Sequence, residues 1–195
     1  MIVPFKVELS GKTLGVERDE QVDSASPDRI PLLKPAFRKD GTVTAANASS
    51  ISDGAAALVL MNEREARERG LRIRARILGH SSHAQEPNSF ATAPIPAIQK
   101  LMTRLGLGRQ DVDLWEINEA FAVVPMAAMV ELGIDHTILN VHGGACALGH
   151  PIGASGARII VTLLNALETR NRALGVASIC IGGGEATAVA IERVD

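Results

Sequence analysis

From residue 72 to the end of the chain, stretches with the two-residue period of a strand alternate with stretches that have the period of a helix. This alternation constrains the fold, because strands connected through helices build a sheet that the helices cover. The last two predicted strands are joined through three glycines, which favours an antiparallel pair. The sequence therefore predicts an α/β fold, a mixed sheet with helices packed on it. The predicted strands are 72–79, 113–117, 138–141, 177–181 and 186–191, and the predicted helices are 95–105, 119–132 and 153–169.

The region before residue 72 is less regular. The first 40 residues are polar and rich in turn-forming residues, so we expect loop with short ordered pieces. Residues 53–61 are apolar and rich in alanine, which fits either a buried strand or a short buried helix. Asn62 is placed to cap a charged helix over 63–69 that ends at Gly70.

Composition argues against several classes of protein. A net charge of −2, 3% aromatic residues and the lack of tyrosine give nucleic acid little to bind or stack on. No apolar run approaches the roughly 18 residues of a membrane span. Two cysteines do not make a disulfide framework, which favours an intracellular, cytoplasmic location. The beginning and the end of the chain resemble neither a signal peptide nor a peroxisomal tripeptide.

Four segments place polar or glycine residues where predicted strands end, and α/β proteins build their sites at such ends. These segments are 42–49, 118–121, 143–156 and 180–184. The glycine-rich run 143–156 lacks the Gly-Lys-Ser/Thr of a phosphate loop and the G-x-G-x-x-G spacing of a dinucleotide fold. Its glycines must therefore serve another purpose.

Each candidate residue has a structural alternative. Asn118 could cap the following helix, and His150 could be a buried histidine bonded to backbone. Cys180 could be a small core residue, and the glycines could serve turn geometry alone. In combination, a histidine, a cysteine and an asparagine at successive strand ends can form one acyl-transfer site. There the thiol would move a proton, while the imidazole and a backbone N–H would stabilise oxyanions.

Three runs closely resemble the signature blocks of thiolases in order and spacing. They are Asn118-Glu119-Ala120-Phe121, the run from Gly143 to Arg158, and Cys180-Ile181-Gly182-Gly183-Gly184. Segments 34–37, 40–45, and 47–49 with 53–56 add an upstream block of the same family. The resemblance covers nearly the whole chain and implies the thiolase-like layered fold, here its carboxy-terminal half only. The Asn-Glu-Ala-Phe block favours the ordinary ketothiolase branch.

The resemblance implies catalytic roles for four residues. In thiolases a reactive cysteine takes the acyl group from an acyl-CoA, and a second acetyl-CoA, deprotonated at its α-carbon, attacks that thioester. By resemblance, His150 activates the nucleophile and helps to form the oxyanion hole of the enolate, in which Asn118 holds a catalytic water. Cys180 is the acid/base for the α-proton, and Gly182 donates its N–H to the oxyanion of the acyl-enzyme.

The resemblance also implies a pocket for the pantetheine arm of coenzyme A. Coenzyme A thioesters are then substrates, and no resident cofactor is expected. Ala46 and Ser50 stand where many relatives have glycine, which would slightly reshape the wall of this pocket. The residues assigned to the pocket are Phe37, Ala45, Ser49, Ala120 and Phe121.

Two further features leave alternatives open. Phe90 lies where relatives vary near the acyl end, so it either influences chain-length preference or has a surface or core role. His80 and His83 are spaced as two metal ligands could be, but no cysteine or carboxylate cluster lies nearby. We therefore expect no metal site.

By resemblance, residues 1–52 end the CoA-covering loop region, 53–72 are a strand and helix of the amino-terminal domain, and 73–195 form the carboxy-terminal domain. The family's nucleophilic cysteine lies in the first half of a full-length chain, and Cys146 fits packing among small residues. These 195 residues are thus expected to be inactive alone and to require an amino-terminal thiolase half, with homo-oligomers formed.

The expected activity is acyl transfer from acyl-CoA to carbon, with acetoacetyl-CoA made or cleaved. The alternative is a non-catalytic CoA-binding or interaction module that kept the fold without the nucleophile. Restored turnover on adding an amino-terminal half would separate the two.

Overall fold

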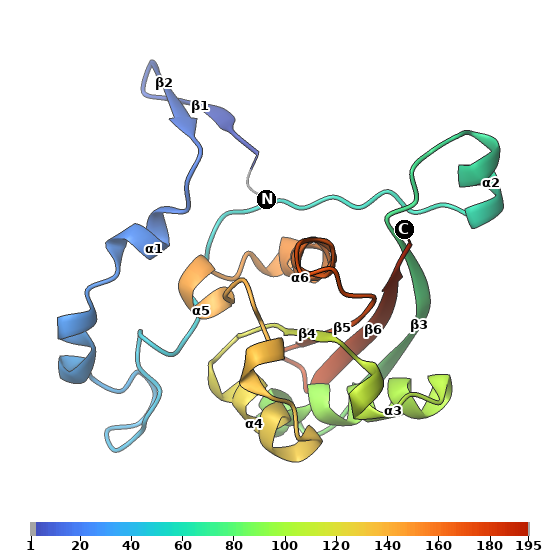
Figure 1. The fold of residues 1–195 in the computed structure, drawn as a ribbon. Helices are drawn as coiled ribbons and strands as arrows, with labels where there is room; N and C mark the ends of the chain where they lie inside the picture. The colour runs from blue at the N-terminus through green and yellow to red at the C-terminus, as the bar shows by residue number, and fades with distance from the viewer. Residues whose placement is uncertain (1–2, 195) are drawn as a thin grey trace.

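A four-stranded mixed sheet forms the centre of the protein, whose residues 3–194 are described by a computed structural model. The strands are β3 (Ala75–Ala84), β4 (Leu114–Ile117), β5 (Leu174–Cys180) and β6 (Glu185–Arg193). Their order is β3-β6-β5-β4, with β4 and β5 parallel and the other neighbours antiparallel (Figure 1). The predicted mixed sheet and its antiparallel pair are confirmed.

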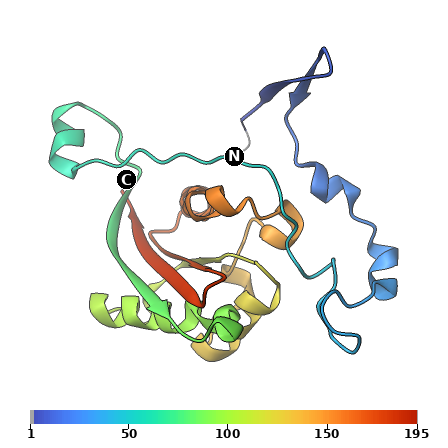
Figure 2. The same ribbon diagram turned by 180° about the vertical axis from the view of Figure 1, so that it is seen from behind.

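Helices cover both faces of this sheet. Helices α3 (Pro94–Leu105) and α4 (Val123–Leu132) lie on one face, and α6 (Ile152–Thr169) lies on the other (Figures 1 and 2). Both α3 and α4 end at a glycine in the left-handed conformation, Gly106 at φ 66° and Gly133 at φ 64°. Glycine adopts this conformation without the steric cost that a Cβ would bring. The predicted end of α3 at Gly106 is therefore confirmed.

Small residues of β5 let α6 pack closely on the sheet. Ala177 faces α6 and is 1% exposed, whereas the equally buried Ala188 and Ala190 of β6 face α3 on the other side of the sheet. A Cβ on Gly175 of β5 would lie 2.7 Å from the Cδ1 of Leu163 in α6. Leucine side chains of α6 fill the space that the small strand residues leave, and this packing seats the helix over β4 and β5.

The amino-terminal region stands apart from the sheet (Figure 1). It contains a hairpin of β1 (Phe5–Leu9) and β2 (Lys12–Val16), then α1 (Glu20–Ser24) and the 3₁₀ helix η1 (Pro27–Leu32). This agrees with the prediction of loop with short ordered pieces. The remaining short elements are α2 (Glu63–Glu68), η2 (Pro87–Thr92), η3 (Arg109–Asp111), η4 (His136–Ile138) and α5 (Ala145–Leu148).

The strand or buried helix predicted within 53–61 is wrong. Residues 50–62 have neither helix nor strand, and Val59 and Leu60 are 89% and 66% exposed. A strand needs a neighbour to receive its backbone hydrogen bonds. Within residues 3–194 no strand pairs with this segment, so it runs extended over α6. The charged helix beyond it is confirmed, since Asn62 accepts a hydrogen bond of 2.9 Å from the Arg64 N–H.

Two further predictions need correction. Asn118 does not cap a helix, because α4 begins at Val123 and residues 120–122 instead hydrogen-bond to 47–49. The strand predicted over 138–141 is reduced to a single bridge between Leu139 and Trp115. There the Asn140 side chain replaces a strand, since its Oδ1 accepts from the Ile117 N–H at 2.8 Å and its Nδ2 donates to the Ile117 carbonyl at 2.9 Å.

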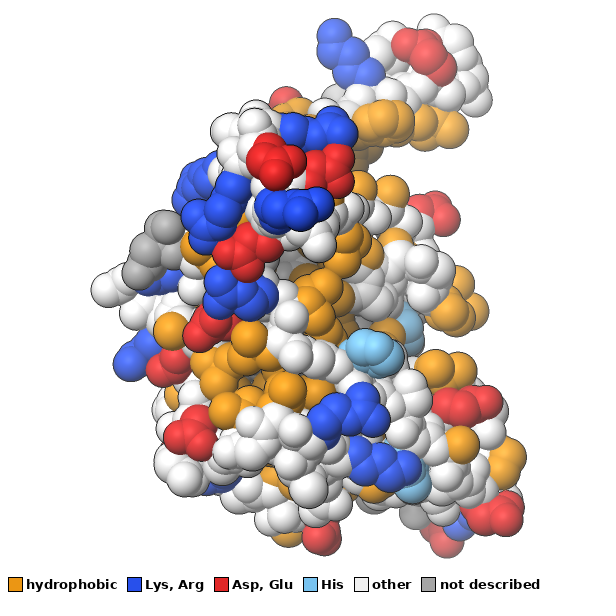
Figure 3. All heavy atoms as spheres, turned by 90° about the vertical axis from the view of Figure 1, so that its right-hand side faces the viewer, with side chains coloured by type: hydrophobic (Ala, Val, Ile, Leu, Met, Phe, Trp, Pro, Cys, Tyr) orange, Lys and Arg blue, Asp and Glu red, His pale blue; other side chains and the backbone are white. Residues whose placement is uncertain are grey.

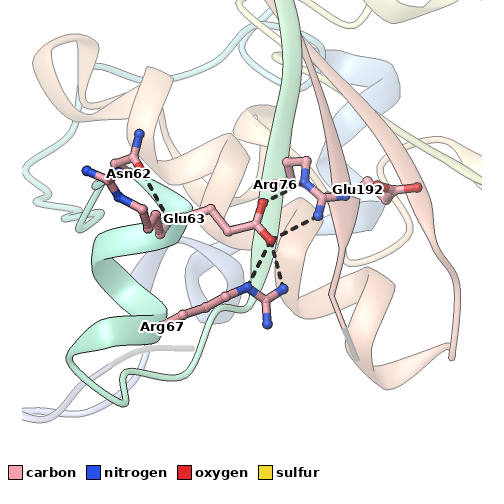
Figure 4. Close-up of polar contacts among 6 residues, drawn as sticks. Asn62, Glu63, Arg67, Arg76 and Glu192 are labelled. Atoms are coloured by element: carbon pink, nitrogen blue, oxygen red, sulfur yellow. Dashed lines mark hydrogen bonds and ion pairs between the residues drawn. The ribbon is translucent and has the colours of Figure 1, made fainter.

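An ion-pair network joins α2 to the sheet (Figure 4). Glu63 accepts hydrogen bonds from Arg67 within α2 and from Arg76 of β3, and Arg76 also lies 3.0 Å from Glu192 of β6. Figure 3 shows acidic and basic side chains gathered over this part of the surface. Glu63 is the centre of the network, and its two arginine partners lower its pKa to about 2.

We predict that the attachment of α2 depends on pH. A carboxyl group whose pKa is depressed stabilises the folded state above its ordinary pKa of 4.5 and loses this effect as pH falls toward 2. Hydrogen-exchange protection of α2 should therefore be constant between pH 7 and 5 and decline below about 4.5. Glu63→Gln should weaken protection already at pH 7, whereas Glu68→Gln, which removes only the exposed contact to Arg64, should not. Equal effects of the two variants would contradict the role of Glu63.

Candidate active site

Asn118 and Cys180 meet at one edge of the sheet. Asn118 directly follows β4, and its N–H donates to the Ser178 carbonyl of β5 at 3.0 Å. Cys180 is the last residue of β5. Because β4 and β5 are parallel, their carboxyl ends lie at the same edge, where α/β proteins place ligands. The structure thus brings these two predicted site residues to neighbouring strand ends.

His150 reaches the same edge from the loop before α6. Its Nε2 lies 3.2 Å from the Nδ2 of Asn118, and its Nδ1 lies 2.6 Å from the Oγ of Ser155. Its backbone N–H donates to the Ser50 carbonyl at 2.9 Å. The preceding Gly149 has φ 88°, and a Cβ there would lie 2.1 Å from the Ser52 Oγ. A glycine is therefore required for the close approach of the two segments that hold His150.

Both neighbours of His150 are themselves oriented by further hydrogen bonds. Arg158 of α6 donates through Nη2 to the Oδ1 of Asn118 at 2.9 Å. Since a guanidinium has no acceptor, the Asn118 Nδ2 faces His150 and donates to its Nε2. On the other side, Ser155 donates to the Pro151 carbonyl at 3.0 Å, so its oxygen accepts from the imidazole. The network therefore places the proton of a neutral His150 on Nδ1 and leaves a lone pair on Nε2.

The surroundings of His150 favour its neutral form. Burial lowers the pKa of His150, and the nearby positive charge of Arg158 lowers this pKa further. A histidine whose pKa lies below its ordinary 6.5 is uncharged at neutral pH. His150 can then accept a proton from a thiol, which is the role of a general base.

Three further residues belong to the site and were not predicted from the sequence: Glu116, Ser155 and Arg158. Ser155 and Arg158 lie inside the glycine-rich signature run, three residues apart on α6, so both could have been found there. Glu116 lies two residues before Asn118, which places the two side chains on one face of the chain. Glu116 and Ser155 are buried, at 1% and 0% exposed.

Cys180 is 6% exposed, and burial raises the pKa of its thiol. The thiol is therefore protonated at neutral pH, as a proton donor must be. A tight turn follows, in which the Gly184 N–H donates to the Ile181 carbonyl at 3.1 Å. Gly184 has φ 100°, and a Cβ there would lie 2.2 Å from the Gln85 carbonyl oxygen. Gly182, at the tip of this turn, is exposed.

Cys146 sits in an environment that suppresses reactivity. Burial and the adjacent carboxylate of Glu119 raise the pKa of its thiol to about 12. Glu119 also accepts a 3.0 Å hydrogen bond from the Cys146 N–H and a 3.1 Å bond from the Asn140 Nδ2. A thiol with so high a pKa is a poor nucleophile, because the thiolate is the reactive form. This environment agrees with the packing role expected from the sequence.

Four of the five residues assigned to the pantetheine pocket lie together. The Ser49 N–H and Oγ both donate to the Ala120 carbonyl, at 3.1 and 2.8 Å. The ring of Phe121 lies edge-on to that of Phe37, with 5.7 Å between centroids. Ala45 lies on an exposed turn closed by the Asn47 N–H and the Thr44 carbonyl. Their roles toward coenzyme A remain predictions.

Phe90 and the histidine pair of β3 have structural surroundings of their own. Phe90 is half-buried, with its ring centroid 6.1 Å from that of Phe121. His83 contacts Gln85 through Nε2 at 3.1 Å and the Lys100 ammonium through Nδ1 at 3.0 Å. Among residues 3–194, no three histidine, cysteine or carboxylate side chains converge as metal ligands would. In the same part of the chain no helix is long and apolar enough to cross a membrane.

An α/β sheet with an asparagine, a histidine and a cysteine at its carboxyl edge defines a protein equipped for acid/base chemistry. Comparison with protein families assigns it more closely. The sequence model for "Thiolase, C-terminal domain" matches residues 71–193, and that for "Thiolase, N-terminal domain" matches residues 1–64. The chain belongs to the thiolase family.

Individual relatives support this assignment. The chain is 52% identical to a probable acetyl-CoA acetyltransferase of Dictyostelium discoideum, covering 96% of this chain and 45% of that protein. It is 49% identical to the acetyl-CoA acetyltransferase of Escherichia coli K12, covering 100% and 50%. The chain thus spans about half the length of the curated relatives it matches.

Solved structures agree with the fold. The acetyl-CoA acetyltransferase of Bacillus anthracis superposes with a TM-score of 0.95 at 44% identity, covering 99% of this chain and 49% of that one. The Acat5 thiolase from Ascaris suum in complex with coenzyme A gives a TM-score of 0.87 at 42% identity, with the same coverage of 99% and 49%. The layered thiolase fold expected from the sequence is confirmed.

We predict that Glu119 keeps Cys146 unreactive. Replacing Glu119 with glutamine removes a negative charge that disfavours the thiolate, so the pKa of Cys146 should fall. Alkylation of Cys146 by iodoacetamide at pH 8 should accelerate by up to about tenfold, the factor that one pKa unit gives. Mass spectrometry of the peptides would measure this rate. Cys180 is the internal control, because burial and not Glu119 raises the pKa of its thiol, so its alkylation rate should not change. Equal acceleration of both cysteines would indicate a loosened fold instead.

Proposed function

We propose that this chain supplies the carboxy-terminal part of the active site of an acetyl-CoA acetyltransferase, which makes or cleaves acetoacetyl-CoA. The observation that carries this proposal is the hydrogen-bonded sequence Asn118–His150–Ser155, placed at the sheet edge where Cys180 ends the adjacent strand. Relatives that bear this name at about 50% identity over the whole chain support the choice of substrate.

In this proposal His150 begins the reaction. Its Nε2 lone pair takes the proton of a cysteine thiol that lies outside these 195 residues, and the thiolate attacks the carbonyl carbon of an acyl-CoA. The tetrahedral intermediate collapses to a thioester on that cysteine, and the leaving CoA thiolate takes the proton of the Cys180 thiol, so that Cys180 becomes a thiolate and His150 keeps its proton on Nε2. In this proposal the N–H of Gly182, which is exposed at the tip of its turn, donates to the oxyanion of the acyl-enzyme.

Cys180 and Asn118 act in the second half of the cycle. The Cys180 thiolate, formed when Cys180 gives its proton to the leaving CoA, removes a proton from the α-carbon of acetyl-CoA. The resulting enolate attacks the acyl-enzyme thioester, which forms the carbon–carbon bond and releases the nucleophilic cysteine as a thiolate that takes its proton back from His150. The raised pKa of Cys180 makes its thiolate a stronger base. The enolate oxygen is stabilised by the Nε2–H that His150 gained from the nucleophilic thiol and by a water held on Asn118.

We further propose that coenzyme A thioesters bind along the surface formed by residues 47–49 and 120–121. The aromatic ring of Phe37 is 71% exposed and, with Phe121, offers an apolar wall to a pantetheine arm. Ser49 is bonded to Ala120 beside this wall, and Ala45, on its exposed turn, is included only because the family resemblance implies it. The CoA complex of the Ascaris suum relative supports the choice of ligand, and no resident cofactor is part of the proposal.

The proposal includes a requirement for a second half. Both Cys146 and Cys180 have raised pKa values, so neither is an activated nucleophile. These 195 residues alone should therefore not turn over, and an amino-terminal thiolase half, within an oligomer, would supply the missing cysteine. The raised pKa values of Cys146 and Cys180 also favour the second candidate function, a non-catalytic CoA-binding module, because such a module needs no activated nucleophile.

The test is acetoacetyl-CoA thiolysis, followed as loss of thioester absorbance, with this chain alone and mixed with a separately expressed amino-terminal thiolase half. Turnover should appear only in the mixture. In the mixture, His150→Ala and Cys180→Ala should each lower kcat by roughly 10²- to 10⁴-fold, the usual range for a lost acid/base group. Cys146→Ala should retain activity and serves as the matched control. Turnover by the chain alone would refute the requirement for a second half. A folded mixture that binds coenzyme A without turnover would favour the non-catalytic module.

A further inference from the structure

A buried ion pair lies directly behind Asn118 and has no part in the reaction as described. Arg158 donates through Nη1 to the Oε1 of Glu116 at 3.1 Å and through Nη2 to the Oδ1 of Asn118 at 2.9 Å. The Glu116 side chain is 2% exposed and that of Arg158 is 19% exposed. Burial raises the pKa of Glu116 to about 8, although the adjacent Arg158 opposes this rise. Burying such a pair costs about as much free energy as its attraction returns, so stability alone gives little reason for it.

The geometry of the pair explains what it provides. Glu116 and Asn118 are two residues apart at the end of β4, so their side chains leave the chain on the same face. The two terminal nitrogens of one planar guanidinium reach both side chains at once. Glu116 thereby fixes the plane of the guanidinium, and the second nitrogen can then hold the Asn118 amide in a single orientation.

The orientation of this amide determines what His150 meets. With its Oδ1 held by Arg158, Asn118 presents its Nδ2 to the Nε2 of His150 at 3.2 Å. A flipped amide would present Oδ1 there and favour an imidazole with its proton on Nε2, which could not accept a proton from a thiol. On the other side of the ring, Ser155 donates its proton to the Pro151 carbonyl, so its oxygen accepts a hydrogen bond from His150 Nδ1. This contact also favours the tautomer with its proton on Nδ1.

We propose that Arg158, held in place by Glu116, is a positioning residue that fixes the amide of Asn118 and through it the tautomer of His150. The proposal deepens the proposed function, because the tautomer serves His150 as the base for the nucleophilic thiol. The tautomer itself is a property of this chain and can be measured without turnover.

The direct test is nitrogen NMR of the ¹⁵N-labelled 195-residue chain, with the His150 resonances assigned by comparison with His150→Gln. In the unchanged protein the shifts should report a proton on Nδ1. Arg158→Lys keeps the positive charge but loses the two terminal nitrogens that reach Glu116 and Asn118 together. Arg158→Met removes the charge as well as these nitrogens. Each variant should therefore move the His150 shifts toward a mixture of tautomers. Glu116→Gln, which still offers an oxygen to Arg158, should keep most of the Nδ1–H form.

Two further variants keep the test interpretable. Arg158→Met leaves Glu116 buried without its cation and could prevent folding. The double variant Glu116→Gln with Arg158→Met removes that charge, and its tautomers should be mixed as well. Thr162→Val is the control, because Thr162 lies one turn further along α6, is buried and makes no hydrogen bond through its hydroxyl. It should leave the tautomer unchanged. A pure Nδ1–H form in both folded Arg158 variants would overturn the proposal.

Turnover gives a second readout in the mixture with an amino-terminal half. Arg158→Lys should lower kcat by roughly 10- to 100-fold, the scale expected when a reacting group is misplaced by less than 1 Å, while KM stays within about threefold. A loss of folded protein would lower the apparent kcat but would not change the tautomer. If the unchanged mixture never turns over, the proposed function fails, while the tautomer shifts still decide the role of Arg158.

Discussion

The parallel pairing of β4 and β5 is the contact on which the candidate site depends. It places Asn118 and Cys180 at the same sheet edge, whereas antiparallel pairing of these two strands would put their carboxyl ends at opposite edges. Helix α6 then packs over both strands because Gly175 leaves room for Leu163. That packing brings the amino-terminal end of α6, with His150 just before it and Arg158 two turns along, against the edge where the strands end. A few close contacts between small residues therefore set the positions of groups that come from three distant parts of the sequence.

Burial sets the chemical character of these groups. The same desolvation lowers the pKa of His150 and raises that of Cys180, because it disfavours whichever form carries a charge. The site thus holds a neutral base and a neutral acid at neutral pH. Burial also raises the pKa of Cys146, although Cys146 is less buried than Cys180, and the carboxylate of Glu119 raises this pKa further. The two thiols therefore differ both in burial and in the charge beside them.

The regular elements could be predicted from the sequence wherever its periodicity is strong, as in α3, α6, β5 and β6. Predictions were wrong where hydrogen bonds from distant residues decide the local structure. The side chain of Asn140 replaces a strand beside β4, and the bonds between 47–49 and 120–122 delay the start of α4 to Val123. The apolar run within 53–61 has the composition of a strand but no partner among the described residues. For the site, family resemblance supplied His150, Asn118 and Cys180. The signature run that contains Arg158 could have pointed to this residue, but its contacts with Glu116 and Asn118 were seen only in the structure, because the run does not indicate which buried side chains meet.

The contact between Gly149 and Ser52 links two segments that lie almost a hundred residues apart. The backbone of His150 is bonded to Ser50 in the same place, at 2.9 Å. Recombination between two related genes with a crossover anywhere between these segments would join a loop and a glycine turn of different ancestry. Most such crossovers would preserve every helix and strand, yet those that paired a bulkier residue with Gly149 would displace His150. Viable chimaeras of this family should therefore inherit the two segments together, as a single unit of exchange.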